Sequence, residues 1–581
     1  LLFVLACGGE EATPTPAATA TATATATAVP TATATATKAP TTTPTTGPAA
    51  TPTPTRAGPV ATPTPTVVAT PTPTPGVQPK RGGSIYQTGA VPPHWDSQIF
   101  VPGDPPSRPY NNLFYNQREQ IVTCEICTEW HLENNGKTMV FAMIQGIKFH
   151  DGREMTSADV AYSLNKIMGQ IDGIISQRCG VIKEYIDSIT TPSKYELRIN
   201  LVRPSAFVPK VLSTAYCSLY PNGTTREDLQ AKPVGSGAWL VTNIITGAGY
   251  TLERNPNYFK PGLPYLDKIT MLQAETAAVT AAFATHRIEF VGGLGKPTAS
   301  DYISYNKLLA DGKIASRRAP AGCQPQGLVS VVSKPPFSDI NVRKAANLAL
   351  DRQEYGKIAW NNEYDAALLW LAGSEFGRPA SEIWNVVPGW GTGAKKVQEI
   401  EQGRLLLAQT YPNGIAVDQM NQYASGEGLT RVELIQAQLA RVNIRTTIKT
   451  TAGGANEADV KRGNLDYTME MAYRCQTTMD PDEMVGGYWI TGAARNFFGY
   501  SNPEIDKLYL QMSGELDPAK RKQLVRQIED IIILKDVVIG PMPDTFTEHF
   551  WWKRLHNADG MGLAPAYGSG FRRWEDWWID Q

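Results

Sequence analysis

The sequence lacks the recognisable motifs of metal-binding and catalytic proteins. Its 581 residues include only six histidines, which are scattered, and no His-x-x-x-His pair or Cys/His cluster. It also lacks a Gly-x-Ser-x-Gly elbow, a His-Glu-x-x-His motif and a Walker A loop. Carboxylates are abundant, but their spacing marks no pair. We therefore expect no metal site and no cofactor, whereas two carboxylates from distant segments could still form a glycosidase-like pair.

The sequence also lacks an excess of positive or negative charge, and it lacks long apolar runs. The formal net charge is −1, which gives no electrostatic reason to expect a nucleic acid as partner. After the first residues, no segment approaches the 18 apolar residues that a membrane-spanning helix needs. A chain of 581 residues is too long for one core, so we expect two or three domains.

The chain opens on a short apolar run without an initiator methionine. Leu1–Cys7 has the composition of the end of a signal peptide. Val4–Cys7 resembles a bacterial lipobox, which would make Cys7 the lipidated first residue of the mature protein. The alternative is a chance cysteine in an apolar run. With the lipobox, the protein is expected in the cell envelope, lipid-anchored on the outer face of the cytoplasmic membrane or periplasmic.

Residues 8–79 consist almost wholly of Thr, Pro and Ala and contain no aromatic residue. Such a segment has too few apolar groups to form a core and is predicted to be disordered. Its prolines favour extended polyproline II, at about 3.1 Å per residue, which gives a long, semi-stiff tether. The folded part is expected to begin near Lys80.

One stretch in the last third of the chain has the pattern of a strand followed by a polar loop. Leu465–Tyr473 alternates apolar and polar residues, which predicts a strand with one face in a core. Polar residues follow, and Asp480-Pro481 cannot continue a β-ladder. Open α/β sheets bind ligands at the carboxyl ends of their strands. The alternative is an ordinary solvated loop.

Several local signals predict elements of a folded core. We expect a strand at Ser84–Thr88, and a helix from Thr156, capped by Asp159, with an apolar stripe. We expect a second helix at Asp339–Leu350 and a third after the capping pair Asp517-Pro518. Gly235 and Gly237 are interpreted as turn positions with positive φ.

Four collinear motifs carry a resemblance to a known family. Together they make residues 80–581 similar to the family 5 extracellular solute-binding proteins, the oligopeptide-, dipeptide- and nickel-binding type of ABC importers. The motifs lie at Gly146–Leu164, Val234–Tyr258, Pro336–Arg352 and Tyr500–Asp506.

The resemblance implies a two-lobed α/β fold of the periplasmic-binding-protein type, in its large form with an extra N-terminal subdomain. The implied boundaries are a signal-peptide end at 1–7, a disordered tether at 8–79, a first lobe at 80–325 with its subdomain near 112–232, a second lobe at 326–540, and a return to the first lobe at 541–581. The implied partners are a small organic solute and the permease subunits of an ABC importer, and a monomer is expected. The resemblance also implies a binding protein and no enzyme. The alternative is the same fold used as a lipid-anchored sensor or adhesion module without transport.

In peptide-binding members, the loop before the Asp-Pro pair holds a Trp and an Asp, and that Asp binds the peptide's α-ammonium. Counting back from Asp480-Pro481 puts Arg474 and Thr477 in these two places. Thr lacks the negative charge that a buried ammonium needs, and Arg favours a carboxylate or phosphate. We expect a neutral or anionic solute, unless Arg474 points to solvent or pairs with Asp480 or Asp482. The expected ligand-binding residues are Trp95, Val101, Gly103, Tyr473, Arg474, Gln476, Thr477, Tyr488 and Trp489.

Six cysteines remain when Cys7 is set aside, and an even number in an exported protein favours disulfides. Six cysteines allow 15 pairings. Some family members join cysteines at the places of Cys323 and Cys475, so the resemblance implies that bond. The other expected bonds are Cys179–Cys217 and Cys124–Cys127, with a redox role for the latter Cys-x-x-Cys as the alternative.

Overall fold

The computed structural model describes residues 78–99, 106–116, 122–292, 299–320, 324–360, 362–370, 372–421, 426–450, 467–474, 478, 480–493, 495–560 and 574–580. They all belong to the second of the two units into which the chain divides, Thr64–Gln581. The predicted lipidation site Cys7 and nearly all of the predicted tether lie outside the described residues. Within the described ranges, no helix combines the length and the apolar character needed to cross a membrane.

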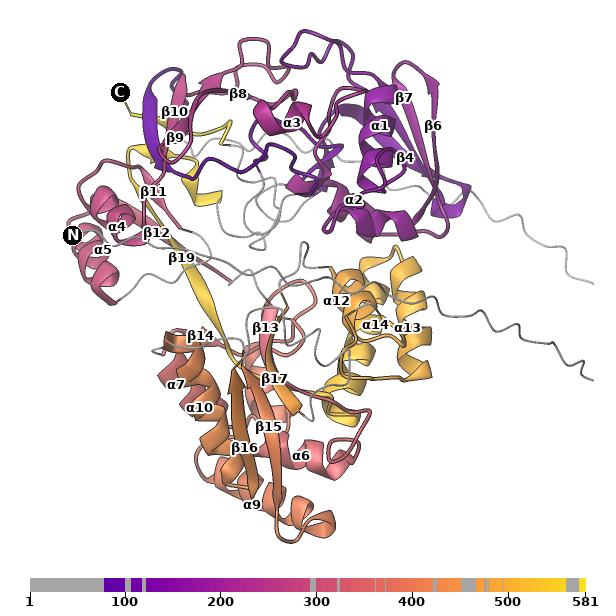
Figure 1. The fold of residues 1–581 in the computed structure, drawn as a ribbon, viewed down its shortest axis with the longest axis vertical. Helices are drawn as coiled ribbons and strands as arrows, with labels where there is room; N and C mark the ends of the chain where they lie inside the picture. Colours follow the sequence, from indigo (N-terminus) through magenta and orange to yellow (C-terminus); the bar gives the residue numbers. More distant parts are fainter. Residues whose placement is uncertain are drawn as a thin grey trace, which may run out of the picture. The chain divides into compact units, whose positions relative to one another are not determined.

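Two four-stranded sheets form the part that we call the first lobe (Figure 1). The first sheet has the order β1-β10-β9-β8, with β1 parallel to β10 and the other pairs antiparallel. Its strands are β1 (Ser84–Thr88), β10 (Lys268–Leu272), β9 (Gly249–Arg254) and β8 (Trp239–Ile245). The strand predicted at Ser84–Thr88 is confirmed.

The second sheet of the first lobe is antiparallel, with the order β4-β5-β7-β6. Its strands are β4 (Cys127–Glu133), β5 (Thr138–Met143), β7 (Glu196–Leu201) and β6 (Ile186–Ser193). Helix α1 (Ser157–Ile167) packs on β6 and β7. The predicted capping box is present, because Asp159 accepts a 2.7 Å hydrogen bond from the Thr156 amide.

Both predicted bonds near this sheet are formed, Cys124–Cys127 and Cys179–Cys217. Short elements complete the first lobe. They are β2 (Phe114–Asn116), β3 (Val122–Cys124), α2 (Phe207–Leu212), α3 (Asp228–Ala231), α4 (Thr276–Ala284), α5 (Ala299–Ala310), β20 (Leu555–His556) and β21 (Trp578–Ile579).

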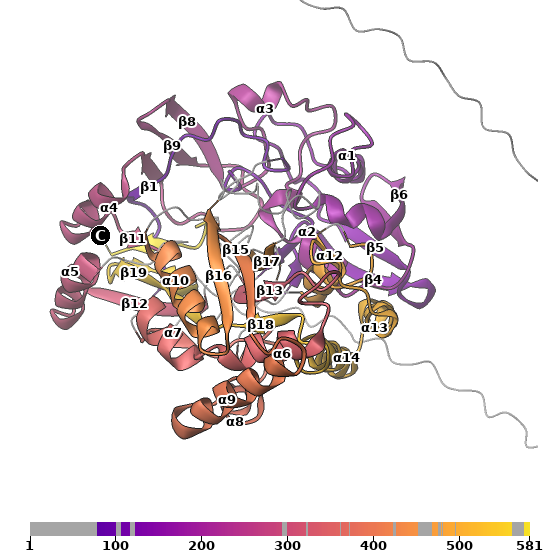
Figure 2. The same cartoon turned by 60° about the horizontal axis from the view of Figure 1, so that its bottom comes forward.

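A five-stranded sheet with the order β16-β15-β17-β13-β18 forms the centre of what we call the second lobe (Figures 1 and 2). Its strands are β16 (Ile444–Thr450), β15 (Ile415–Asn421), β17 (Tyr467–Arg474), β13 (Gln324–Ser330) and β18 (Ile539–Pro541). The strand predicted at Leu465–Tyr473 is therefore confirmed. The described strand begins two residues later, at Tyr467, and ends one residue later, at Arg474. It pairs parallel with β15 and antiparallel with β13.

Helices cover both faces of this sheet. Leu328 and Val329 are neighbours in β13, yet they belong to two different apolar clusters, because side chains alternate across a strand. The cluster of Leu328 includes residues of α6, α7, α9 and α10, and that of Val329 includes residues of α8, α12, α13 and α14. These helices are α6 (Ile340–Ala349), α7 (Arg352–Ala359), α8 (Ala380–Val386), α9 (Gly393–Thr410), α10 (Gly426–Ala440), α12 (Pro481–Tyr488), α13 (Pro503–Gly514) and α14 (Pro518–Asp530).

The predicted cap at Asp517 is confirmed, and aspartates also cap two other helices of this lobe. Asp339 accepts a hydrogen bond from the Asn341 amide at the start of α6, and Asp517 accepts from the Ala519 amide at the start of α14. Asp480 does the same at the start of α12, with Pro481 as the first helical residue.

One strand pairs with elements of both lobes. In β19 (Asp544–Trp552), Thr545 pairs with Tyr364 of β14 (Tyr364–Asp365), whereas the residues from Phe546 onward pair with β12 (Ile314–Pro320). The end of β19 also pairs with β11 (Phe290–Val291). The chain then returns to the first lobe, where Trp574 and Trp577 pack in the apolar cluster of β1, β8, β9 and β10.

Candidate functional site

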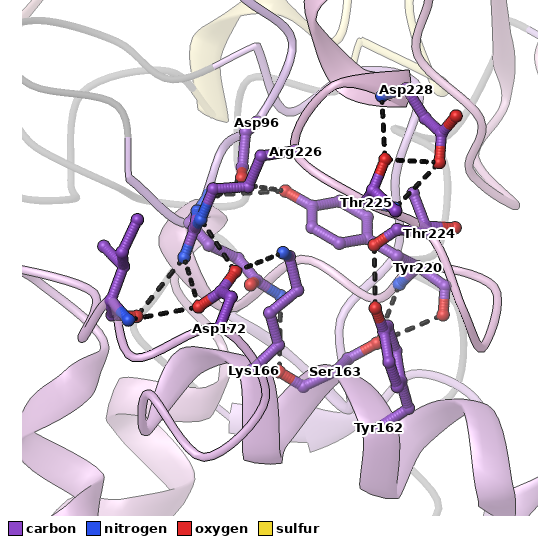
Figure 3. A network of polar contacts seen from close by, with 12 residues as sticks. Asp96, Tyr162, Ser163, Lys166, Asp172, Tyr220, Thr224, Thr225, Arg226 and Asp228 are labelled. Carbon is purple, nitrogen blue, oxygen red and sulfur yellow. Dashed lines mark hydrogen bonds and ion pairs between the residues drawn. The ribbon is translucent and has the colours of Figure 1, made fainter.

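A buried network of charges fixes the chain on the first lobe just before the predicted ligand loop (Figure 3). Asp96 is 1% exposed and accepts hydrogen bonds from Arg226 Nη1 at 2.6 Å and from the Tyr220 hydroxyl at 2.9 Å. Arg226 Nε lies 2.8 Å from Asp172, which also pairs with Lys166 at 2.7 Å. The two carboxylates and two cations balance, so burial of this network leaves no net charge.

The same network keeps Tyr220 in its neutral, donating form. Burial, and then the charge of Asp96, raise the pKa of Tyr220 well above its ordinary value. Gln98 is also buried, and its amide group donates to the Ser218 carbonyl at 2.9 Å. The hydrogen bonds of Asp96 and Gln98 therefore fix the position of the chain from Asp96 to Gln98.

The glycines of the Val234–Tyr258 motif act differently from the prediction. Neither Gly235 nor Gly237 has a positive φ. Both lie against the chain at Arg108–Tyr110, where a Cβ on Gly237 would come within 2.6 Å of the Pro109 carbonyl carbon. The turn interpretation is thus wrong, and what requires glycine is close approach of two backbones. The Gly237 amide also donates to the Pro109 carbonyl at 3.0 Å.

On the second lobe, the Asp-Pro loop holds two buried carboxylates and one buried guanidinium. Arg521 of α14 donates to Asp480 through both Nη atoms, at 2.8 and 2.5 Å, and to Asp482 at 2.5 Å. Burial alone would raise the pKa of Asp480, but the charges of Arg521 and Lys210 outweigh it and the pKa lies below its usual range. Burial and the neighbouring Asp480 raise the pKa of Asp482.

This cluster also joins the two lobes. Lys210 of α2 lies 3.1 Å from Asp480 and 3.1 Å from Glu375, and the Tyr185 hydroxyl donates to Asp482 at 3.0 Å. The Tyr185 hydroxyl is also 3.1 Å from that of Tyr509. No pattern in the sequence predicted a role for Lys210, Tyr185 or Arg521.

Three expected ligand-binding residues have their side chains in apolar cores. Trp95 is 2% exposed and packs edge-to-face on Tyr250, with ring centroids 5.3 Å apart. Trp489 is fully buried and stacks on Phe498, and Tyr488 is 4% exposed. The ends of α12 and of the Trp95 segment turn these rings inward, and solute binding by these three residues stays a prediction.

The other expected residues are described only in part. Tyr473 and Arg474 are the last two residues of β17, where the backbone but not the side chains is described. Val101, Gly103, Gln476 and Thr477 lie outside the described residues, as do Cys323 and Cys475. Binding through all these residues stays a prediction.

Two lobes built of α/β layers, joined at a shared strand and at a polar contact, define the periplasmic-binding-protein class. Solved structures of this class are similar. DppA from Helicobacter pylori in complex with peptide STSA has a TM-score of 0.68 at 19% identity, covering 86% of this chain and 99% of that one. AgaA from A. tumefaciens R10 in complex with agropinic acid has a TM-score of 0.65 at 19% identity, covering 86% and 99%.

Sequence comparison identifies the family. The model of the bacterial extracellular solute-binding proteins, family 5 Middle, matches residues 122–496. The glutathione-binding protein GsiB of Escherichia coli (strain K12) is 23% identical over 483 residues, which are 80% of this chain and 88% of that protein. The chain belongs to the family 5 extracellular solute-binding proteins, and the predicted family and fold are confirmed. It is an extracytoplasmic solute-binding protein of the ABC importer type, and its relatives are binding proteins rather than enzymes.

Proposed function

We propose that the chain captures a neutral or anionic organic solute between its lobes and delivers it to the permease of an ABC importer. The observation that carries the solute class is the end of β17, where Arg474 and Thr477 replace the Trp and Asp of peptide-binding members. A buried ammonium needs a carboxylate partner, whereas a guanidinium binds carboxylates and phosphates with two parallel hydrogen bonds.

The contacts of the Asp-Pro loop support this proposal. Asp480 and Asp482 are the two acids of the Asp-Pro loop that could pair with Arg474, and both already pair with Arg521. Lys210 adds a second cation to Asp480. Both carboxylates are therefore already neutralised by cations of the protein. Neither is available to bind a ligand ammonium, and neither needs Arg474 as a counterion.

The relatives narrow the choice of test solutes. GsiB is named for glutathione, and AgaA was solved with agropinic acid. Glutathione, small organic acids, unmodified di- to pentapeptides and their N-acetylated forms make a panel that separates recognition of an ammonium from recognition of an acid.

The experiment combines native mass spectrometry of the purified chain with calorimetric titration of this panel. We expect a retained or added organic acid, and a loss of its affinity on the order of 10- to 100-fold in Arg474→Ala. Arg404→Ala is the matched control, because Arg404 lies in the second lobe with an exposed side chain paired to Glu401. Submicromolar affinity for unmodified peptides, unchanged by Arg474→Ala, would contradict the proposal.

The proposal includes a lipid anchor at Cys7, the tether of residues 8–79 and a monomeric receptor. Its support is the lipobox-like Val4–Cys7 and the composition of the tether. Expression of the chain from a full precursor should give a membrane-bound protein, and Cys7→Ser should release it into the soluble fraction. An unmodified Cys7 in the N-terminal peptide of the membrane-bound form would refute the anchor, and light scattering on the solubilised protein tests the monomer.

A further inference from the structure

Arg108, on the first lobe, has a guanidinium without a carboxylate partner among the residues that the structure describes. Two arginines that are more deeply buried, Arg521 and Arg352, are satisfied. Arg521 pairs with Asp480 and Asp482, and Arg352 donates to a set of backbone carbonyls and to Asn347. The described contacts of Arg108 are a hydrogen bond with Tyr250 and a stacking contact with Trp574, and its buried Nε has no acceptor. The indole N–H groups of Trp370, Trp390 and Trp489 are also buried without an acceptor, but the Arg108 donor belongs to a cation, which an anionic group could satisfy.

A second unused donor lies beside the first. The guanidinium carbon of Arg108 is 3.8 Å from the centroid of the Trp574 ring, and Trp574 Nε1 is buried without an acceptor as well. Trp574 is 4% exposed and stacks on Trp577, with centroids 4.7 Å apart. Its φ of 57° is strained for a bulky aromatic residue, and such strain concentrates at binding sites.

The acid next to Trp574 in the sequence is already used. Glu575 follows Trp574 directly, but its oxygens accept from Lys260 at 2.6 Å and from the Tyr258 hydroxyl at 2.6 Å. Burial lowers the pKa of Arg108, because desolvation outweighs the interaction of its guanidinium with Tyr250.

The backbone of Arg108 is held in place, while its side chain keeps partial exposure. Gly235 and Gly237 pack directly on residues 108–110, and the Tyr110 hydroxyl donates to the Trp95 carbonyl at 2.6 Å. Arg108 itself is half-buried rather than sealed, so a solute can approach the side chain. A fixed cation with unused donors and an aromatic neighbour is a preorganised anchor.

We propose that Arg108 is the first-lobe anchor for a carboxylate of the solute, with the Trp574 indole beside it. This inference rests on the proposed solute-binding function and adds to it an acidic group and the lobe that holds this group. The planar fork of a guanidinium matches the two oxygens of a carboxylate, and the indole N–H offers a further donor next to it. The solute is therefore an organic acid rather than a neutral molecule.

The test compares the full chain with Arg108→Gln and Arg108→Lys. Arg153→Gln is the matched control, because Arg153 is an exposed arginine of the same lobe that pairs with Asp151. Native mass spectrometry reports which solute each purified protein retains. Calorimetry then uses glutathione and an N-acetylated tripeptide, each as the free acid and as the C-terminal amide, together with inorganic phosphate.

We expect the wild type and Arg153→Gln to retain the same solute and to prefer the acid over the amide by on the order of 10- to 100-fold. Arg108→Gln should lose the solute and this preference. Arg108→Lys keeps the charge and should fold normally, yet it should lose most of the preference because it lacks the fork. Thermal unfolding without solute shows whether each variant is folded.

The outcomes separate the two proposals. A wild type that retains no solute and binds no probe would overturn the proposed function and this inference together. If the wild type, Arg108→Gln and Arg108→Lys all bind an acid equally well, the inference alone would be overturned. Phosphate bound in place of the carboxylates would overturn the assignment of a carboxylate.

Discussion

Tyr185 in the first lobe donates a hydrogen bond of 3.0 Å to Asp482 at the start of α12 in the second lobe, 297 residues further along the chain. Burial, and then the charge of Asp482, raise the pKa of Tyr185 far above its ordinary value, so the hydroxyl stays a donor. Lys210 reaches Asp480 beside it at 3.1 Å. The two lobes are therefore joined by a buried polar contact that exists only when they meet.

Removing this contact should favour separated lobes. Tyr185→Phe deletes the hydroxyl and leaves the ring, and we expect the affinity for solute to fall by roughly 2- to 10-fold. Small-angle scattering without solute should show a larger radius of gyration. Tyr195→Phe is the control, because the Tyr195 hydroxyl donates to Glu154 within the first lobe. Unchanged scattering and affinity in Tyr185→Phe would show that the contact does not bias closure.

Arg521 should be essential for the stability of the second lobe. Arg521→Met leaves the buried carboxylates of Asp480 and Asp482 without their main counterion, which is expected to cost about 3–5 kcal/mol of unfolding free energy. Urea unfolding measures the loss. Arg526→Met on the same helix should cost under about 1 kcal/mol, because its partner Glu382 keeps Arg378. Equal losses in the two variants would argue against the buried cluster.

His549 should make the protein less stable in mild acid. Burial, and then the charge of Arg317, lower the pKa of His549 to about 4. The unfolded chain takes up this proton near pH 6.5, so stability is full above that pH and falls as the pH drops towards 4, by at most about 3 kcal/mol. Below pH 4 this group adds no further change.

Urea unfolding at pH 7 and pH 4.5 measures this effect. His549→Gln should reduce the difference between the two pH values, whereas His131→Gln should not, because His131 is exposed and pairs with Glu133. A pH dependence that is the same in the wild type and His549→Gln would assign it to other groups.

Gly237→Ala should damage the first lobe, although Gly237 is not a turn residue. The added methyl would lie 2.6 Å from the Pro109 carbonyl carbon and 2.7 Å from the Arg108 carbonyl oxygen, both parts of the backbone. We expect a loss of about 1–3 kcal/mol, together with weaker solute binding. Gly487→Ala, in α12, meets no atom within 4 Å and should be neutral or slightly stabilising. Thermal and urea unfolding measure the stability of the two variants, and an equal stability of both would contradict the prediction.

A count of free thiols on the unreduced protein tests the remaining disulfide. The last described pair of the β13–β17 ladder is Gln324 with Arg474, which are the immediate sequence neighbours of Cys323 and Cys475. We expect these two cysteines to be bonded, and so no free thiol among the six. Two free thiols mapped to Cys323 and Cys475 would exclude the bond.

The sequence was sufficient where a local signal determines a local structure. Apolar alternation predicted β17, the Asp517-Pro518 pair predicted the start of α14, and the capping box predicted α1. Each depends on residues within a few positions of one another. The family motifs added the two-lobed fold, which no local signal specifies.

The contacts that build the site could not be predicted in this way. Arg521 and Asp480 are separated by 41 residues and Lys210 and Asp480 by many more, so nothing in the sequence marks them as partners. Trp489 follows the Asp-Pro loop closely, but the helix it ends turns it into a core. Gly237 has the appearance of a turn residue, and only the neighbouring backbone shows the actual requirement.

Strand β19 carries a mechanical consequence for solute capture. Its first residues are hydrogen-bonded to β14 and its remainder to β12 and β11, so any rotation of one lobe against the other must twist this strand near Thr545 and Phe546. The strand therefore connects the two lobes mechanically and is deformed when they rotate. Loading and release should then be visible as a change in amide hydrogen exchange within those few residues.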